Sequence, residues 1–181
     1  MSSTRPGQPA PKTPTQSSPS SRPGSPGKAG GVETLAAFYR ARLNEEDATA
    51  RAVLWDGSGN RASWSLAASA TVDVGTEDFC TGDRTIANHV VDHDPEHILV
   101  DVNAKRTLLD DLIAERHLVV DGDCWYTCPA ATEKRDGGEN CDDDRRGGPC
   151  DCGLTERTER RLRILIAPYA QHPEYQETWR P

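Results

Sequence analysis

The longest amphipathic stripe in the chain begins at Asp94-Pro95 and constrains the fold more than any other feature. Asp94 can cap the free backbone N–H groups of a helix, and proline suits the first helical position. Apolar residues then recur at spacings of three and four until the stripe fades near Arg116: Ile98, Leu99, Val102, Leu109, Leu112 and Ile113. This pattern predicts a helix of about 20 residues with one face packed on other elements.

Two further segments show the same periodicity. Residues 33 to about 53 predict a first helix whose face is mostly apolar: Leu35, Phe38, Tyr39, Arg42, Leu43, Glu46, Ala50 and Val53. A third helix is expected to start near Leu154-Thr155, with Thr155 as its cap, and to end or kink at Pro168. In the segment that follows, Tyr175 and Trp179 are large enough to dock back on the core.

The segment between the first two helices has a different pattern. Residues 64–74 alternate apolar and polar side chains after a turn-forming stretch, which predicts a two- or three-stranded antiparallel element. A short helical run at residues 85–91 leads to the Asp94-Pro95 boundary. We therefore expect a mainly α (small α+β) fold with three main helices, a minor antiparallel β element and a Cys-rich insert between the second and third helices.

Composition predicts the domain organisation. Residues 1–31 hold seven of the 13 prolines and no Phe, Trp, Ile, Leu or Val, so we expect a disordered Pro/Ser/Gly-rich tail. Residues 32–181 are expected to form a single globular domain, with its Cys-rich insert at 121–153. The tail carries four basic residues and no acid, whereas the whole chain carries a net charge of −8, which leaves −12 for the rest.

These charges limit the classes of partner. Phosphate backbones repel an acidic domain, so broad nucleic-acid binding is disfavoured and an unidentified protein partner is favoured. The chain begins without an apolar signal segment and contains no run of about 20 apolar residues, so we expect a cytoplasmic protein that does not span a membrane.

Five of the six cysteines lie in the acidic, Gly-rich insert: Cys124, Cys128, Cys141, Cys150 and Cys152. They form a C-x₃-C pair, a single cysteine and a C-x-C pair, with 21 residues between Cys128 and Cys150. Structural zinc takes four ligands tetrahedrally and binds thiolates, so two close pairs separated by a loop predict a structural Zn²⁺ site that uses four of these five. Free or reversibly oxidised thiols and disulfides are the alternatives.

Histidines offer a second possible constellation. His89, His93 and His97 recur every four residues, and with nearby acids such a face could hold a metal ion. The residue before a proline avoids the helical region, so Asp94-Pro95 breaks that face. Only His89 and His93 are expected to share a helix, and capping, packing or surface roles are the alternative for them.

Four stretches carry a resemblance to a known family: LAAFYRARLNEEDATAR, IANHVVDHDPEHILVDVNAKRTLLD, the CDCG segment and LRILIAPYAQHPEYQETWRP. Over most of residues 33–181 the chain resembles the DUF6221-type family of uncharacterised proteins from actinobacteria and actinophages. The resemblance implies a small cytosolic protein and no assigned activity.

No other catalytic pattern is present in the sequence: it has no phosphate-binding Gly-rich loop, nucleophile elbow or HExxH motif. We therefore expect a non-enzymatic protein-binding or adaptor module with a structural zinc knuckle. The first alternative is a zinc-knuckle regulator associated with nucleic acid. A more remote alternative is a metal-dependent hydrolase that uses His89 and His93.

Overall fold

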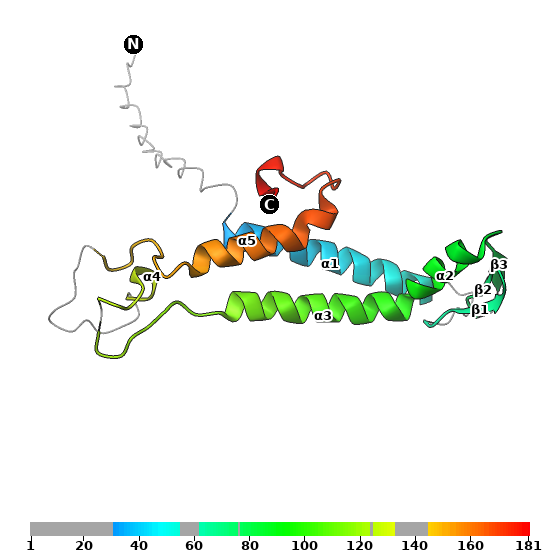
Figure 1. Ribbon diagram of the computed structural model, residues 1–181, viewed down its shortest axis with the longest axis horizontal. Helices are drawn as coiled ribbons and strands as arrows, with labels where there is room; N and C mark the ends of the chain where they lie inside the picture. Colours follow the sequence, from blue (N-terminus) through cyan, green and yellow to red (C-terminus); the bar gives the residue numbers. More distant parts are fainter. Residues whose placement is uncertain (1–30, 55–61, 76, 124, 133–144) are drawn as a thin grey trace, which may run out of the picture.

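Three long helices form the body of the protein: α1 (Val32–Leu54), α3 (Pro95–Ala114) and α5 (Leu154–Ile166). The computed structural model describes residues 31–54, 62–75, 77–123, 125–132 and 145–181. α3 runs antiparallel to α1, and α5 also packs along α1 and runs in the same direction as α1 (Figure 1). The prediction of a mainly α fold with three main helices is confirmed.

One apolar core joins the three helices. The side chains of Leu35, Leu43 and Val102 are fully buried, and burial of each aliphatic side chain of this size contributes about 1.5–3 kcal/mol. The core cluster also holds the following buried residues: Ala36, Phe38, Tyr39, Leu109, Leu112, Leu162, Ile166 and Trp179. Among the described helices, none combines the length and the apolar character needed to cross a bilayer.

A small sheet lies at one end of the long axis, beside α2 (Arg84–Asp92) (Figure 1). Its strands are β1 (Ser65–Ala68), β2 (Thr71–Asp73) and β3 (Asp78–Cys80), which pair antiparallel in that order. Val72 and Ala87 are fully buried between the sheet and α2. The predicted β element and short helix are therefore confirmed. The thiol of Cys80 is exposed at the edge of this sheet.

Asp94 joins the sheet end to the helical body. Its Oδ1 atom accepts a hydrogen bond from the His97 backbone N–H at 2.7 Å and caps α3, as the sequence predicts. Its Oδ2 atom accepts one from the Trp64 backbone N–H at 3.0 Å. The carboxylate is buried, and its two oxygens accept hydrogen bonds from backbone groups 3 and 30 residues away in the chain.

The C-terminal segment folds back on α1. After α5 the chain tightens at Pro168 into the 3₁₀ helix η1 (Ala167–Tyr169), and it ends with η2 (Glu177–Trp179) (Figure 1). Trp179 is buried with its ring centroid 5.0 Å from that of Phe38, and Tyr175 packs against the same core. The docking expected for these two aromatic residues is confirmed.

Arg42 fixes this segment from the apolar face of α1. Its guanidinium is buried 5.0 Å from the Phe38 ring centroid and contacts His172. It also pairs with Glu45 at 2.8 Å and Glu174 at 3.3 Å. A buried guanidinium needs such partners, so the basic residue in the predicted apolar face of α1 acts as a link to the C-terminus.

Candidate metal centre

The chain segments that leave α3 and enter α5 meet at the end of the molecule opposite the sheet (Figure 1). His117 lies just beyond Ala114, the last residue of α3, and Cys152 lies just before Leu154, the first residue of α5. Between them, Cys128 precedes the short helix α4 (Pro129–Thr132), and its backbone N–H donates to the Leu118 carbonyl at 2.9 Å. Three separate parts of the chain are thus brought to one point.

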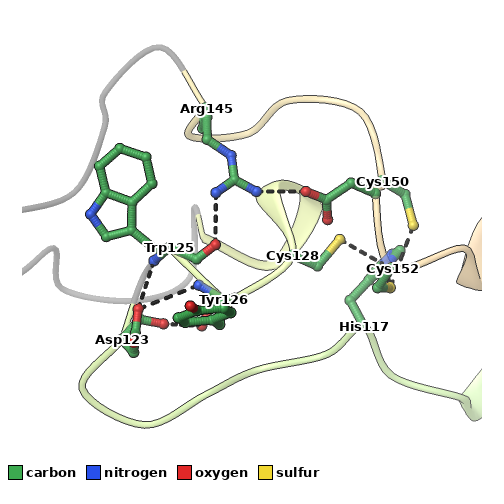
Figure 2. Close-up of polar contacts among 10 residues, drawn as sticks. His117, Asp123, Trp125, Tyr126, Cys128, Arg145, Cys150 and Cys152 are labelled. Atoms are coloured by element: carbon green, nitrogen blue, oxygen red, sulfur yellow. Dashed lines mark hydrogen bonds and ion pairs between the residues drawn. The ribbon is translucent and has the colours of Figure 1, made fainter.

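Four potential ligand atoms gather at this point (Figure 2). They all lie within 4.8 Å of one another and come from His117, Cys128, Cys150 and Cys152. His117 Nδ1 is 3.6 Å from the Sγ atoms of Cys128 and Cys152. The Sγ atoms of Cys150 and Cys152 are also 3.6 Å apart.

These separations fit tetrahedral coordination. With Zn–S bonds of about 2.3 Å and Zn–N bonds of about 2.0–2.1 Å, tetrahedral angles place two sulfurs about 3.8 Å apart and a nitrogen and a sulfur about 3.6 Å apart. The measured 3.6 Å distances are close to both values. A disulfide would instead require an S–S distance of about 2.05 Å. Among the described cysteines, Cys80, Cys128, Cys150 and Cys152 are all free.

The donor set is shielded from solvent. Cys128 is only 1% exposed, and His117, Cys150 and Cys152 are half-buried. One histidine with three cysteines is among the usual ligand sets of structural zinc. These four residues can therefore hold a metal ion.

The start of α5 stabilises one of the thiols in its charged form. Burial opposes ionisation of Cys150, but hydrogen bonds from the backbone N–H and hydroxyl of Thr155, and from the thiols of Cys152 and Cys128, lower its pKa to about 5. Cys150 is thereby prepared as a thiolate, the form that binds metal. The sequence predicts Thr155 as the cap of this helix. α5 instead begins after Gly153 without a side-chain cap, so Thr155 lies inside its first turn and donates hydrogen bonds to the Cys150 sulfur.

Tight turns support the Cys128 ligand. The Thr127 hydroxyl is buried and donates to the backbone carbonyls of Asp123 at 2.8 Å and Val120 at 3.2 Å. The Asp123 carboxylate accepts the Trp125 backbone N–H at 3.0 Å. Arg145 then donates to the Trp125 carbonyl at 2.7 Å and pairs with Asp151 at 2.5 Å, which ties this turn to the Cys150 side of the site (Figure 2).

Two glycines allow the backbone to reach the site. Gly153 has a φ of +76°, and a Cβ there would lie 2.8 Å from the Arg157 guanidinium. At Gly148 a Cβ would lie 2.9 Å from the Arg145 carbonyl oxygen, closer than real Cβ atoms come. Because backbone cannot yield as a flexible side chain can, glycine is needed at this second position.

The structure brings together three of the five predicted cysteine ligands: Cys128, Cys150 and Cys152. Cys124 and Cys141 lie outside the described residues. Our sequence interpretation missed His117, because it considered only the cysteine spacing. The available signal was a histidine just beyond the end of a predicted helix and 11 residues before Cys128. The cysteine pairs have C-x₃-C and C-x-C spacings in place of two C-x₂-C pairs, which leaves room for a ligand of another type.

Three other histidines, His89, His93 and His97, lie near the sheet end of the molecule, where α2 is followed by α3. His89 and His93 have ring centroids 4.3 Å apart, and His93 Nδ1 bonds to the His89 carbonyl oxygen at 2.8 Å. As expected from Asp94-Pro95, His97 lies in the next helix, with its ring centroid 6.3 Å from that of His93. Within the described part of the chain, none of the three joins a group of three or more close metal ligands.

The fold and this donor set define a small, mainly α-helical protein with a candidate His/Cys₃ metal centre. The chain belongs to DUF6221, a family of unknown function whose model matches residues 32–181. Comparison with curated proteins and with solved structures gave no match.

Proposed function

We propose that this protein is a non-enzymatic protein-binding module whose Cys-rich segment folds around a structural Zn²⁺ ion. The proposed ligands are Cys128, Cys150, Cys152 and His117. The observation that carries the proposal is the convergence of three Sγ atoms and one Nδ1 atom within 4.8 Å, at separations that suit a tetrahedral ion.

The donor chemistry favours zinc among the common divalent ions. Thiolates are soft ligands, which select zinc or copper(I) over magnesium or calcium, and imidazole also suits zinc. The filled d shell of Zn²⁺ imposes no geometric preference, and structural zinc sites are almost always tetrahedral with sulfur and nitrogen ligands. Cys124 and Cys141 are retained as candidate ligands in the sequence-based prediction, which the described residues do not test.

Four protein ligands favour a structural role. Catalytic zinc keeps one position open for water or substrate, whereas a set of four side chains fills a tetrahedral ion. The insert has few apolar side chains, so it gains little from burial. Zinc binding typically supplies apparent free energies of about 10–16 kcal/mol in small structural sites, enough to order such a segment.

Metal analysis tests the proposed centre directly. Tag-free protein purified under reducing conditions should contain one equivalent of zinc by elemental analysis, with its ligand thiols protected from labelling. Cys150→Ser should abolish stoichiometric zinc. Cys80→Ser is the matched control and should retain it, because this exposed thiol lies at the other end of the molecule. A folded protein without metal and with every thiol labelled would overturn the centre.

Two aromatic residues next to Cys128 form a surface suited to a protein partner. Trp125 is 56% exposed and Tyr126 is 73% exposed beside the candidate ligands. Aromatic side chains of this kind are enriched in protein interfaces. The chain outside its basic tail carries a net charge of −12, so we favour a partner with a basic surface.

Capture experiments test the binding role. Wild-type protein should retain a partner by cross-linking and affinity capture, and both Trp125→Ala and Cys150→Ser should lose it. Only the cysteine variant should also lose zinc. Turnover of nucleotide, nucleic-acid or ester substrates that disappears with either variant would instead show an enzyme.

The same two exposed aromatics support the second candidate, a nucleic-acid-associated regulator. Bases stack on exposed Trp and Tyr side chains, and Arg145 lies next to Trp125. This candidate predicts a gel shift with single-stranded nucleic acid that weakens with added salt and with Trp125→Ala. The acidic character of the chain outside its tail opposes such binding, so the protein partner remains our principal proposal.

A further inference from the structure

An apolar groove runs between α3 and α5 on the side away from α1. It has a volume of about 360 Å³ and is lined chiefly by Leu108, Leu112, Ile164 and Leu165. Leu108 is 46% exposed and Ile164 is 57% exposed, so apolar side chains from both helices face solvent here. Their neighbours Leu109 and Leu162 point the other way, into the core. Leu108 and Ile164 therefore do not contribute to the core of a single chain.

The helix arrangement leaves a place for further helices over this groove. α1 packs against both α3 and α5, and the latter two run antiparallel to each other (Figure 1). Four-helix packing buries apolar side chains from all its members around one core. In this protein α3 and α5 supply two neighbouring members of such an arrangement, and the facing pair is not supplied by the described part of the chain.

The two borders of the groove carry opposite charge. Asp111 and Glu115 lie on the α3 side. On the α5 side, Arg161 lines the groove, and Arg157 and Arg160 fall on the same helix face, four residues before Arg161 and Ile164. Glu115 and Arg161 pair across the groove at 2.5 Å.

Two of these border charges are available to a second molecule. Asp111 and Arg160 are both exposed, and neither has an ion-pair partner within 4.0 Å among the residues that the structure describes. They lie on opposite borders, one acidic and one basic. A surface that presents an acid on one side and a base on the other can match a copy of itself.

This pattern selects one two-fold arrangement of two copies. A rotation about an axis along the groove lays α3 of one copy over α5 of its partner, so acids face arginines at both borders. A rotation about an axis across the groove would lay α3 over α3 and α5 over α5, with like charges opposed. Complementary charges favour the first arrangement, and like charges placed opposite one another disfavour the second.

We propose that the α3/α5 groove is a homodimer interface, occupied by the same groove of a second copy. α3 and α5 of the two copies form an antiparallel four-helix packing, with Leu108 and Ile164 at its centre and the acidic border of each copy over the basic border of the other. The groove contains none of the candidate metal ligands, so failure of the dimer proposal would leave the proposed metal centre unaffected, and the reverse also holds.

Light scattering after size-exclusion chromatography of the full chain tests the interface. Wild-type protein should be a dimer, and Ile164→Asp should weaken dimerisation at least about tenfold, because a carboxylate would be buried in an apolar contact. Val100→Asp is the matched control: Val100 is 65% exposed on α3 and does not line the groove, so this variant should remain dimeric. Circular dichroism should show both variants folded.

Charge reversal tests the orientation. Asp111→Lys and Arg160→Glu should each weaken the dimer, and mixing the two variants should restore association, because one border of the mixed dimer regains opposite charges and the other is unchanged. A monomeric wild type, an Ile164→Asp variant that dimerises like wild type, or a mixture no tighter than its components would overturn the proposal. A wild-type monomer that binds only a heterologous amphipathic helix would overturn it as well.

Discussion

The Nδ1 atom of His117 lies 3.6 Å from the Sγ atom of Cys152, although the two residues are 35 positions apart in the chain. The first follows the end of α3 and the second precedes the start of α5. Both helices pack on α1, so this contact closes the loop at the far end of the body. An ion shared by these two atoms would hold the helix ends and the Cys-rich segment together.

Removal of the imidazole should release the metal. We expect His117→Ala to weaken zinc binding by at least about 100-fold, since loss of an outer-shell partner alone typically costs about 10–100-fold. Competition with a chromophoric chelator measures the affinity. His97→Ala is the control, because this exposed histidine lies in the first turn of α3, at the other end of that helix. Equal affinities for the two variants would rule out His117 as a ligand.

The helices and the cysteines differ in how far the sequence predicts them. α1, α3 and α5 follow from apolar periodicity, because each buries one face in the same core. The metal centre depends on the path of a long segment, which periodicity does not describe. His117 joins Cys128 and Cys152 only through that path, and Thr155 reaches Cys150 only because α5 begins after Gly153. No local pattern gives either relationship.

Tyr169 should make the fold sensitive to alkaline pH. Burial and a 2.7 Å hydrogen bond to the Glu46 carboxylate raise the pKa of this phenol well above its ordinary value of 10.0. Above about pH 10 the unfolded chain releases the proton whereas the folded chain keeps it, so stability should fall as pH rises. Below that pH the favourable hydrogen bond is fully present.

Urea denaturation at pH 7, 10 and 11 measures this dependence. Tyr169→Phe should cost about 1–2 kcal/mol at pH 7, because it removes the hydroxyl that donates to Glu46 Oε1 and, among the described residues, leaves that carboxylate only its 3.5 Å ion pair with Lys105. Its stability should then decline less than that of wild type toward pH 11, so the difference between the two proteins should narrow. Parallel curves for the two proteins would show that Tyr169 is not the responsible group.

Asp94 should matter more than an ordinary helix cap. Asp94→Ala removes acceptors for two backbone N–H groups, those of His97 and Trp64, and we expect it to lower stability by about 2 kcal/mol. Asp94→Asn keeps one acceptor oxygen and should lose about half as much. Asp92→Ala, at an exposed position, serves as the control and should change stability by less than about 0.5 kcal/mol. Equal losses for the alanine variants at both positions would contradict this role.

Trp179 should anchor the C-terminal segment through its burial. It is only 2% exposed and contacts Phe38 and Tyr175, with ring centroids at 5.0 Å and 5.7 Å. Trp179→Ala should therefore lower the free energy of unfolding by about 3–5 kcal/mol, as for other large aromatic residues in cores. Trp125→Ala removes the same side chain from a site that is 56% exposed, and it should cost less than about 0.5 kcal/mol.

Chemical denaturation of both tryptophan variants, followed by far-ultraviolet circular dichroism, provides the comparison. The near-ultraviolet signal of the aromatic cluster should also weaken in Trp179→Ala, because Phe38 and Tyr175 lose the ring that fixes their packing. Similar stabilities for the two variants would mean that the last turn of the chain contributes nothing to the core. The C-terminal segment would then depend on its other contacts, such as those of the buried Arg42 with His172 and Glu174.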